Sequence, residues 1–444
     1  MLETKSIPDL IDQSPLSAMQ WRIFILCFLV ALCDGFDTQA IAFTGPAIIQ
    51  AFDLKAGALA PILTAGIVGM VVGAMAFGLL ADKLGRRPVI CLAIAIFSVA
   101  SLATGWATST DQILALRFIA GLGMGGATPA VLALTAEYCP ARHRGTTMTS
   151  VILGLPAGAI LGGLLASKVL PHIGWQGIFM IGGAGPLVLL LVILLFLPES
   201  LHFIARSKDR HANSKIERII GKIVASPPRG GQYIVPEPDA KSGVASLFSQ
   251  GMVRNTTAIW LIYMFNWVAW FMFLSWFPTV LKATGFSAEQ APLGTVVANA
   301  VFLIFAIPFA TILPKVNIRK LLLGMFVLGI AMCVALANSG TNWTLVLVLA
   351  AFAALGIGGQ QLVLNYMVAQ VYPTALRATA TGWAIGLGRV GAIVGSASGG
   401  WFLEQGGPSG FYLALIGPLV VAALGLAIIR AQDPRGVMSP SYQH

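Results

Sequence analysis

The chain has 444 residues, of which 57% are hydrophobic and 10% are charged, and its mean hydropathy is +0.84. Soluble domains carry about 25% charged residues, so this composition excludes an ordinary soluble domain and predicts a polytopic membrane protein. The net charge of +10 would suit a nucleic-acid partner, but the distribution of the charges argues against one.

About twelve apolar segments, each near the ~20 residues that span a bilayer core, follow one another along the chain. The one long polar stretch, 198–253, contains Pro227-Pro228-Arg229-Gly230-Gly231 and is typical of a linker that carries some helix. We therefore predict an all-α membrane protein with twelve transmembrane helices in two six-helix bundles, 1–197 and 254–444, on either side of this linker. The segments are 23–48, 57–81, 88–108, 111–136, 145–171, 175–197, 254–281, 288–313, 319–338, 342–368, 375–402 and 408–430.

The basic residues indicate the orientation. If the N-terminus, every second loop and the C-terminus are assigned to one side, the loops of the other side carry only Lys55, Lys168 and Lys282. Arg117 and Arg389 fall inside apolar segments, and the rest of the 27 Lys and Arg lie on the first side. The positive-inside rule makes that side cytoplasmic, with both termini and the linker. The basic balance therefore reflects topology and contact with an anionic lipid bilayer, and we expect no nucleic-acid partner.

Two aspartates interrupt the first apolar segment, in Asp34-Gly35-Phe36-Asp37. Their i, i+3 spacing puts both on one face of a helix. A carboxylate in hydrocarbon costs about 3 kcal/mol or more and marks a functional site by default. The pair therefore indicates a proton or cation site. The alternative is that one acid pairs with a neighbouring helix or caps a break at Gly35.

The two halves repeat at an offset of 233 residues, which indicates a parallel six-plus-six duplication. At this offset Arg389 corresponds to Pro156, and Asp34 falls near Trp267. Because these positions break the internal symmetry, we expect the substrate beside them. The matching pairs are Pro140 with Pro373, Arg144 with Arg377, and Gly162 with Gly395.

The cysteines and histidines do not show the spacing of a metal site or a disulfide framework. The five cysteines are scattered without CxxC or His-rich spacing, and the five histidines fall in loops or tails. We expect packing cysteines, no metal site and no cofactor. No constellation of nucleophile and base is present either, so we do not expect an enzyme.

The loop after the second segment carries the family resemblance. Residues 78–87 read Gly-Leu-Leu-Ala-Asp-Lys-Leu-Gly-Arg-Arg, which resembles the signature loop of the major facilitator superfamily, G-x-L-A-D-R/K-x-G-R-R. In the fourth segment, Arg117 followed by Gly121, Gly123 and Gly125 resembles the R-x-x-x-G-x-G-x-G pattern of proton-coupled members. The second-half copy of the loop, 313–320, keeps basic residues but lacks the acid.

The resemblance implies a gate at the cytoplasmic ends of the helices. Asp82 lies near a helix end, where it can pair with basic residues of the other half. Glu137 ends the fourth segment close to further arginines. The expected gating group comprises Asp82, Arg86, Arg87, Glu137, Arg144 and Arg377.

A narrower resemblance concerns the acids of the first segment. Residues 34–37 resemble the D-G-x-D motif of the aromatic acid:proton symporter branch, and the stretches 20–22, 26–29 and 386–392 resemble transporters for 4-hydroxybenzoate and protocatechuate. The similarity, over about residues 14–430, implies alternating-access import of small aromatic carboxylates with protons across a bacterial inner membrane. We expect the protein to act as a monomer. The ring substituents stay open, because related members carry benzoates, gentisate, phenylpropionates or muconate.

The two arginines inside apolar segments have different expected roles. The guanidinium of Arg389 suits two-point binding of the substrate carboxylate, and the alternative is an ion pair with an acid on another helix. Arg117 is expected to balance Asp34 or Asp37 and to tune its proton affinity. We therefore assign proton coupling to Asp34, Asp37 and Arg117.

Aromatic and amide side chains could complete the substrate site. Tyr263, Trp267 and Trp270 recur at i, i+4 and i+7 and could hold a flat ring, although aromatic residues also gather at membrane interfaces without a ligand. Amides of the tenth segment could bond a ring hydroxyl or serve ordinary interhelical bonding. The predicted substrate-binding residues are Arg389, Tyr263, Asn266, Trp267, Trp270, Gln360, Gln361 and Asn365.

Other functions within the same fold remain open from the sequence. A proton-coupled antiporter exporting organic compounds would be expected to carry a Gly-Pro pair in the fifth segment, which instead has Gly154-Leu155-Pro156-Ala157-Gly158. A non-transporting sensor would add a soluble domain larger than the linker. An importer of a non-aromatic acid such as muconate is a further alternative.

Overall fold

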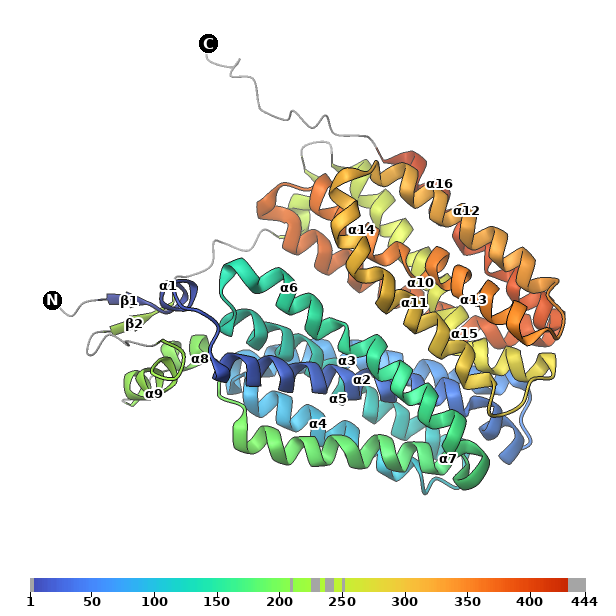
Figure 1. Cartoon of the computed structure of the whole chain (residues 1–444), viewed down its shortest axis with the longest axis horizontal. Helices are drawn as coiled ribbons and strands as arrows, with labels where there is room; N and C mark the ends of the chain where they lie inside the picture. Colours follow the sequence, from blue (N-terminus) through green and yellow to red (C-terminus); the bar gives the residue numbers. More distant parts are fainter. Residues whose placement is uncertain (1–3, 208–210, 225–231, 236–242, 250–251, 430–444) are drawn as a thin grey trace, which may run out of the picture.

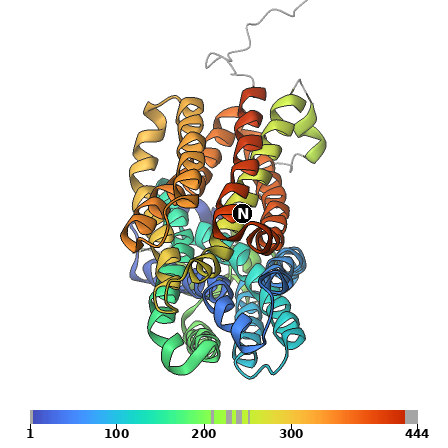
Figure 2. The same cartoon turned by 90° about the vertical axis from the view of Figure 1, so that its right-hand side faces the viewer.

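The structure is a computed structural model that describes residues 4–207, 211–224, 232–235, 243–249 and 252–429. Almost all of this part of the chain is helical, and the helices form two bundles that lie side by side (Figure 1). Seen from one end, the helices of the first half of the chain occupy one side and those of the second half the other (Figure 2). The predicted all-α architecture of two bundles is confirmed.

The N-terminal bundle contains six helices and one short 3₁₀ helix. They are α2 (Ala18–Ala51), η1 (Ala56–Leu59), α3 (Ala60–Leu84), α4 (Arg86–Thr104), α5 (Thr110–Tyr138), α6 (Ala141–Ile152) and α7 (Gly154–Phe196). The C-terminal bundle is built from α10 (Val253–Thr284), α11 (Ala291–Ile312), α12 (Ile318–Ala337), α13 (Trp343–Ile357), α14 (Gln360–Val371), α15 (Thr374–Ala414) and α16 (Ile416–Ile428), with the 3₁₀ helices η2 (Val244–Phe248) and η3 (Leu313–Lys315).

These helices account for twelve membrane crossings. In the described residues, nine apolar helical stretches are long enough to span a bilayer, and the shorter stretch Ala291–Ala306 adds a tenth. Two of the nine are 56 and 50 residues long, and each turns back at a glycine with positive φ. These glycines are Gly174 (φ 75°) and Gly407 (φ 61°). Each long stretch therefore crosses twice, and the two turns are themselves 233 residues apart.

Local sequence explains where several helices begin. Ser17 and Gln20 form a reciprocal capping box at the start of α2, which satisfies two backbone N–H groups that the helix leaves free. Asn317 and Asn342 cap α12 and α13 through their side chains. Gly85 separates α3 from α4 with φ 100°, a conformation that glycine adopts at little cost.

Glycines bring the backbones of paired helices into contact in the same way in both bundles. A Cβ atom on Gly158 of α7 would lie 1.9 Å from the carbonyl oxygen of Leu32 in α2. A Cβ atom on Gly391 of α15 would lie 2.1 Å from the carbonyl oxygen of Met264 in α10. Small residues permit this kind of close helix approach in membranes. The two glycines are 233 residues apart and their carbonyl partners 232, so the internal duplication seen in the sequence is also present in the packing.

A small assembly of the N-terminal segment and the linker covers one end of the N-terminal bundle. Strand β1 (Thr4–Ser6) pairs in parallel with β2 (Gln232–Ile234), beside α1 (Ile7–Asp12), α8 (Leu201–Arg206) and α9 (Ala212–Ile220) (Figure 1). Ile7, Leu201 and Ile216 are buried in the same apolar core as the bundle. The linker helices were predicted, whereas the pairing of the two short strands was not. We call this end, where the Lys- and Arg-rich loops lie, the basic end, and the other the opposite end.

The two bundles share an apolar core only away from the basic end. Helix α2 packs against α10, α7 against α11, and α3 against α15. Residues of the N-terminal bundle near the opposite end, such as Phe43, Leu59 and Phe179, join the core of the C-terminal bundle. At the basic end, the first residues of α6, 141–146, are exposed. The bundles are thus closed against each other at the opposite end.

We predict that Gly158→Ala destabilises the protein, because its Cβ would overlap the backbone of α2 and overpacking costs about 1–3 kcal/mol. Thermal unfolding of the detergent-purified protein, followed by size-exclusion chromatography, should show a lower Tm. Gly185 lies in the same helix with no atom within 4 Å of an added Cβ, so Gly185→Ala is the matched control and should keep or raise Tm. Equal Tm values for the two variants would contradict the assigned contact.

Candidate functional site

A buried ion pair lies at the centre of the N-terminal bundle. Nη1 of Arg117 in α5 is 2.9 Å from Oδ2 of Asp37 in α2, and both side chains are almost fully buried. The sequence left open which aspartate Arg117 balances, and the structure pairs it with Asp37. A buried carboxylate is tolerated when a partner charge and hydrogen bonds replace its water.

Two hydroxyls of α4 complete this ion pair. The Ser101 hydroxyl donates to Asp37 Oδ1, and Arg117 Nη2 donates to Ser101 at 2.9 Å and to Thr104 at 3.1 Å. The guanidinium also lies over the ring of Phe179, 4.6 Å from its centroid, within the range of a cation–π contact. Ser101, Thr104 and Phe179 were not among the predicted site residues. Ser101 holds Asp37 directly, and Thr104 and Phe179 hold its partner Arg117 in place.

Asp34 lies one helical turn away in a different environment. Its two carboxylate oxygens accept hydrogen bonds from hydroxyls, Oδ2 from Thr128 at 2.6 Å and Oδ1 from Thr38 at 3.2 Å. Among the described residues no cation forms an ion pair with it within 4 Å, although Asp34 and Arg389 of the other bundle interact electrostatically. Asp34 is therefore the buried acid without a fixed positive partner.

Arg389 in α15 faces the other bundle. Its Nη1 donates to the carbonyl oxygen of Met70 in α3 at 3.3 Å, across the interface between the bundles. This is the one hydrogen bond of its guanidinium within the described part of the chain, and the side chain is half-buried. A guanidinium carries five N–H donors, so most of them stay available to an anion.

Four predicted substrate residues form one hydrogen-bonded chain between α10 and α14. The Tyr263 hydroxyl donates to Asn365 Oδ1 at 2.8 Å, and Gln361 Nε2 donates to the same oxygen at 3.0 Å. Trp267 Nε1 donates to Gln361 Oε1 at 2.6 Å. An added Cβ on Gly388 would lie 2.8 Å from the Trp267 indole, so this ring packs beside the residue that precedes Arg389.

Asn266 and Gln360 occupy the break between α13 and α14. Asn266 Nδ2 donates to the carbonyl of Ile357 at 3.0 Å and to Gln360 Oε1 at 2.5 Å, and Gln360 in turn donates to Gly356. Both side chains are fully buried. They satisfy carbonyl groups that a helix end leaves free, so their contacts favour a structural role over the predicted contact with substrate.

Trp270 lies apart from the hydrogen-bonded chain. Its ring packs on Gly358 and stacks near Phe273 and Phe302. The spacing of Tyr263, Trp267 and Trp270 predicts one shared face of the helix. That face is wide, however, so side chains at its two edges can point into different surroundings. The structure brings Tyr263 and Trp267 together and directs Trp270 into the core of its own bundle.

The predicted gating residues of the N-terminal bundle meet at the basic end. Arg86 Nη2 is 3.2 Å from Asp82 and its Nε is 3.9 Å from Glu137, which also accepts a hydrogen bond from Ser200. A cavity of about 630 Å³ borders Asp82, Arg86 and Glu137. Asp82 is 66% exposed and its ion pair lies within its own bundle, so its predicted pairing with the other half is not made in this conformation.

Glu199 contacts the predicted gating group, and the sequence analysis did not single it out. Its carboxylate accepts the backbone N–H groups of Arg86 at 2.8 Å and Arg87 at 3.1 Å, where an acid stabilises the start of α4. A Cβ on Gly85 would lie 2.5 Å from this carboxylate and would displace it, and the φ of 100° at Gly85 is itself one that favours glycine. The Arg87 side chain donates to the Leu194 carbonyl.

Arg144 and Arg377 repeat one contact in the two halves. Arg144 Nη2 donates to the carbonyl of Cys139 at 3.5 Å, and Arg377 Nε donates to the carbonyl of Tyr372 at 3.1 Å. Each arginine thus reaches back over the turn between two helices, five residues earlier. Both contacts stay within their own bundle.

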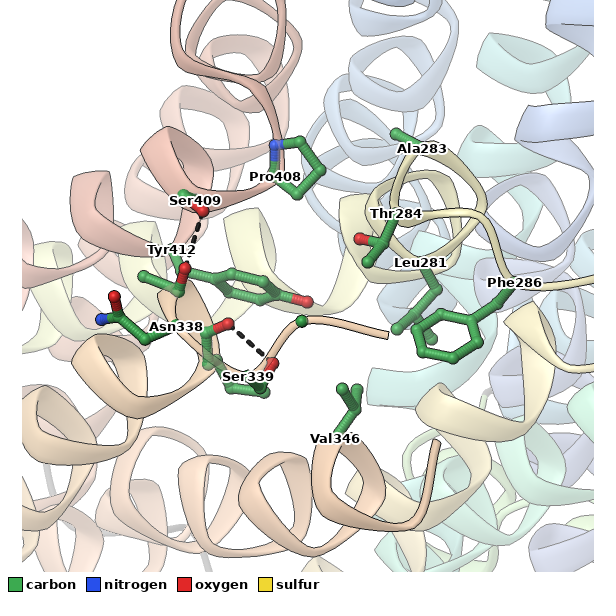
Figure 3. A pocket seen from close by; sticks show the side chains of 13 residues that line it. Leu281, Ala283, Thr284, Phe286, Asn338, Ser339, Val346, Pro408, Ser409 and Tyr412 are labelled. Carbon is green, nitrogen blue, oxygen red and sulfur yellow. Dashed lines mark hydrogen bonds between the residues drawn. The ribbon is translucent and has the colours of Figure 1, made fainter. Parts of the chain in front are cut away.

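A separate pocket of about 480 Å³ opens at the opposite end of the C-terminal bundle (Figure 3). It is bordered by the end of α10, the loop between α12 and α13, and α15, with Phe286, Asn338 and Tyr412 among its side chains (Figure 3). The residues that line it include no charged side chain. It contains none of the predicted site residues, so we do not assign it to the substrate of the central site. No cluster of three or more His, Cys, Asp or Glu suited to a metal occurs in the described residues.

The chain is similar to known proteins in sequence and in fold. The chain matches the family model of the Major Facilitator Superfamily over residues 27–337 and 259–442. The 4-hydroxybenzoate transporter PcaK of Pseudomonas putida is 34% identical, covering 95% of this chain and 95% of its own length. The gallate transporter of Pseudomonas putida is also 34% identical, covering 95% and 94%.

The fold agrees with a solved member of the same class. The D-xylose-proton symporter superposes with a TM-score of 0.70 at 18% sequence identity, covering 92% of this chain and 96% of that one. The chain belongs to the Major Facilitator Superfamily. It is a transporter embedded in a membrane and not an enzyme.

We predict that Arg117→Met strongly destabilises the protein, because it leaves the carboxylate of Asp37 buried without its partner. Removal of one member of a buried ion pair typically costs about 3–5 kcal/mol. The double variant Arg117→Met/Asp37→Leu removes both charges and should recover much of the lost Tm. If the single and double variants unfold at the same temperature, the two side chains do not depend on each other as the structure indicates.

Proposed function

We propose that the protein imports single-ring aromatic carboxylates together with protons. The observation that carries the proposal is the position of Arg389, which faces the acid-bearing N-terminal bundle across the interface and uses one hydrogen bond there. A carboxylate meets a guanidinium in two-point geometry. Relatives whose names specify 4-hydroxybenzoate and gallate support an aromatic acid as the cargo.

Proton coupling follows from the unequal environments of the two aspartates. Asp37 is already neutralised by Arg117, so its protonation would break an ion pair. Asp34 is held only by hydroxyls and interacts electrostatically with Arg389. When Asp34 is ionised it competes with the substrate carboxylate for Arg389, and a proton on Asp34 ends that competition. Proton binding and substrate binding therefore favour each other.

The hydrogen-bonded chain on α10 and α14 provides a candidate site for the ring. Trp267 lies beside Gly388, next to Arg389 in sequence, and could stack on a flat ring. Asn365 accepts two hydrogen bonds through Oδ1, so its Nδ2 remains able to donate to an oxygen on the ring. This arrangement supports hydroxylated benzoates as substrates.

The likeness to proteins of Pseudomonas supports placement in a bacterial inner membrane, with the basic end in the cytoplasm. The gate group at that end would then release the substrate inward. The two bundles pack on each other within one chain, and that chain supplies all the proposed substrate residues, which supports function as a monomer.

The decisive experiment is uptake into proteoliposomes with an imposed pH gradient. The test compounds separate aromatic acids from non-aromatic acids and from neutral aromatic compounds. They are benzoate, 4-hydroxybenzoate, 3,4-dihydroxybenzoate, the non-aromatic diacid muconate and the neutral benzyl alcohol. Uphill accumulation of the aromatic acids that collapses with a protonophore is expected. Transport of muconate alone, or export driven by the same gradient, would overturn the proposal.

We predict that Asp34→Asn keeps or tightens substrate binding but abolishes uphill accumulation, because the amide imitates the protonated acid and cannot release a proton. Isothermal titration of the purified variant and gradient-driven uptake measure the two effects. Asp111→Asn, an exposed acid at the start of α5, is the matched control and should accumulate substrate normally. Full proton-driven accumulation in Asp34→Asn would remove this residue from the coupling mechanism.

We predict that Arg389→Lys weakens binding of the aromatic acid about 10- to 100-fold, because lysine keeps the charge but loses the two-point fork. Arg254→Lys is the control, since Arg254 also lies in the C-terminal bundle but is exposed and bonds to the carbonyl of Ile428. Direct titration of both variants decides the point. Unchanged affinity in both Arg389→Lys and Arg389→Ala would exclude a contact with the carboxylate.

A further inference from the structure

Besides the Arg389 contact, a second hydrogen bond joins the two bundles, and it lies at the opposite end. The backbone N–H of Gly57 in η1 donates to Glu404 Oε1 in α15, with 2.6 Å between nitrogen and oxygen. Glu404 belongs to neither the predicted gate nor the predicted substrate site. It is the side chain through which the C-terminal bundle reaches the loop between α2 and α3.

This contact supplies an N-terminal capping acceptor, which η1 lacks in its own bundle. The residue at its N-cap position, Lys55, makes no side-chain capping hydrogen bond. The first N–H groups of a helix need acceptors from outside the helix, and a carboxylate is favoured there by the helix dipole. Glu404 therefore acts as the N-terminal cap of a helix that belongs to the other bundle.

The surrounding backbone is fitted to this contact. A Cβ on Gly57 would come within 3.0 Å of the Glu404 carboxylate, and a Cβ on Gly400 would lie 2.8 Å from the Gly57 Cα and 2.4 Å from the Trp276 ring. Gly400 thus lets the backbone of η1 lie directly on α15. The contact can form only when the two bundles are closed together at this end.

The internal duplication shows that the contact exists on one side of the molecule only. At the 233-residue offset, Glu404 corresponds to Pro171 and Gly57 to Gln290. The related surface between α7 and α11 is instead apolar, with Gly163 packed on Val296. The capping contact is therefore an addition to the duplicated scaffold.

We infer that Glu404 is a gating residue that stabilises the state closed at the opposite end by capping η1 from the other bundle. In a transporter with alternating access, the bundles rock about the central site. Opening of the opposite end must separate η1 from α15 and break this hydrogen bond. Loss of the cap therefore shifts the equilibrium toward the state that is open at the opposite end and closed at the basic end.

Hydrogen–deuterium exchange of the full-length protein in lipid nanodiscs tests the inference. In Glu404→Ala we expect faster exchange in peptides covering residues 55–60 and slower exchange in peptides covering 141–150, which become covered when the basic end closes. The ratio of the two states should shift about 3- to 10-fold, the effect of one hydrogen bond. Glu404→Gln keeps an acceptor oxygen and should give a smaller shift.

Glu289→Ala is the matched control, because Glu289 is an exposed acid in the loop at the same end and should leave both peptides unchanged. The protection at residues 141–150 separates gating from a local role, since a cap that mattered only for η1 would change exchange at residues 55–60 alone. That local pattern, or no change in either region, would overturn the inference.

Discussion

An ionised carboxylate inside a lipid-embedded bundle must be matched by a positive charge, and in this protein the Asp37–Arg117 ion pair meets that demand. The pair draws α2, α4 and α5 together, because Ser101 and Thr104 bond to it from α4. With Arg117 paired to Asp37, the second acid, Asp34, has the hydroxyls of Thr38 and Thr128 as its partners. Arg389 lies on the other bundle and donates one hydrogen bond across the interface. In the proposed mechanism, Asp34 and Arg389 are the acid and the base that change partners.

The two duplicated halves share their structural contacts but differ in the side chains of the candidate site. Both halves use glycine to bring two backbones into contact, turn back at a positive-φ glycine, and fold an arginine onto the preceding helix end. The two halves differ in their polar and charged side chains. The first half holds the two acids, and the second holds Arg389 and the amides of α14. The two sets lie in different bundles, so a change in the relative position of the bundles would change their interaction, as the proposed coupling of protons to substrate requires.

Hydrophobic length predicted the membrane-spanning segments, and the repeat spacing predicted matching features in the two halves. The cost of burying a charge predicted that Arg117 pairs with an aspartate of the first segment. These properties can be read from the local sequence, whereas positions decided by tertiary contacts could not be predicted. Trp270 has the spacing of a ring-binding residue but packs on Gly358. Asn266 and Gln360 donate hydrogen bonds to carbonyl groups at the break between α13 and α14, and the apolar sequence there gives no sign of a break. Glu199 and Glu404 are single acids at segment ends, and nothing in the sequence indicates that each caps a distant helix. The β1–β2 pairing joins residues more than two hundred positions apart.

That strand pairing changes the effective length of the connection between the bundles. The polar linker looks long enough to let the two halves drift apart, but its first part is anchored through α8, α9 and β2 to the N-terminal bundle. Only the chain between Val235 and η2 is left to bridge the gap, and eight residues reach about 28 Å at full extension. That length sets an upper limit on the distance between the end of β2 and the start of η2 in any conformation of the protein. The covalent connection therefore restricts how far the two bundles can separate.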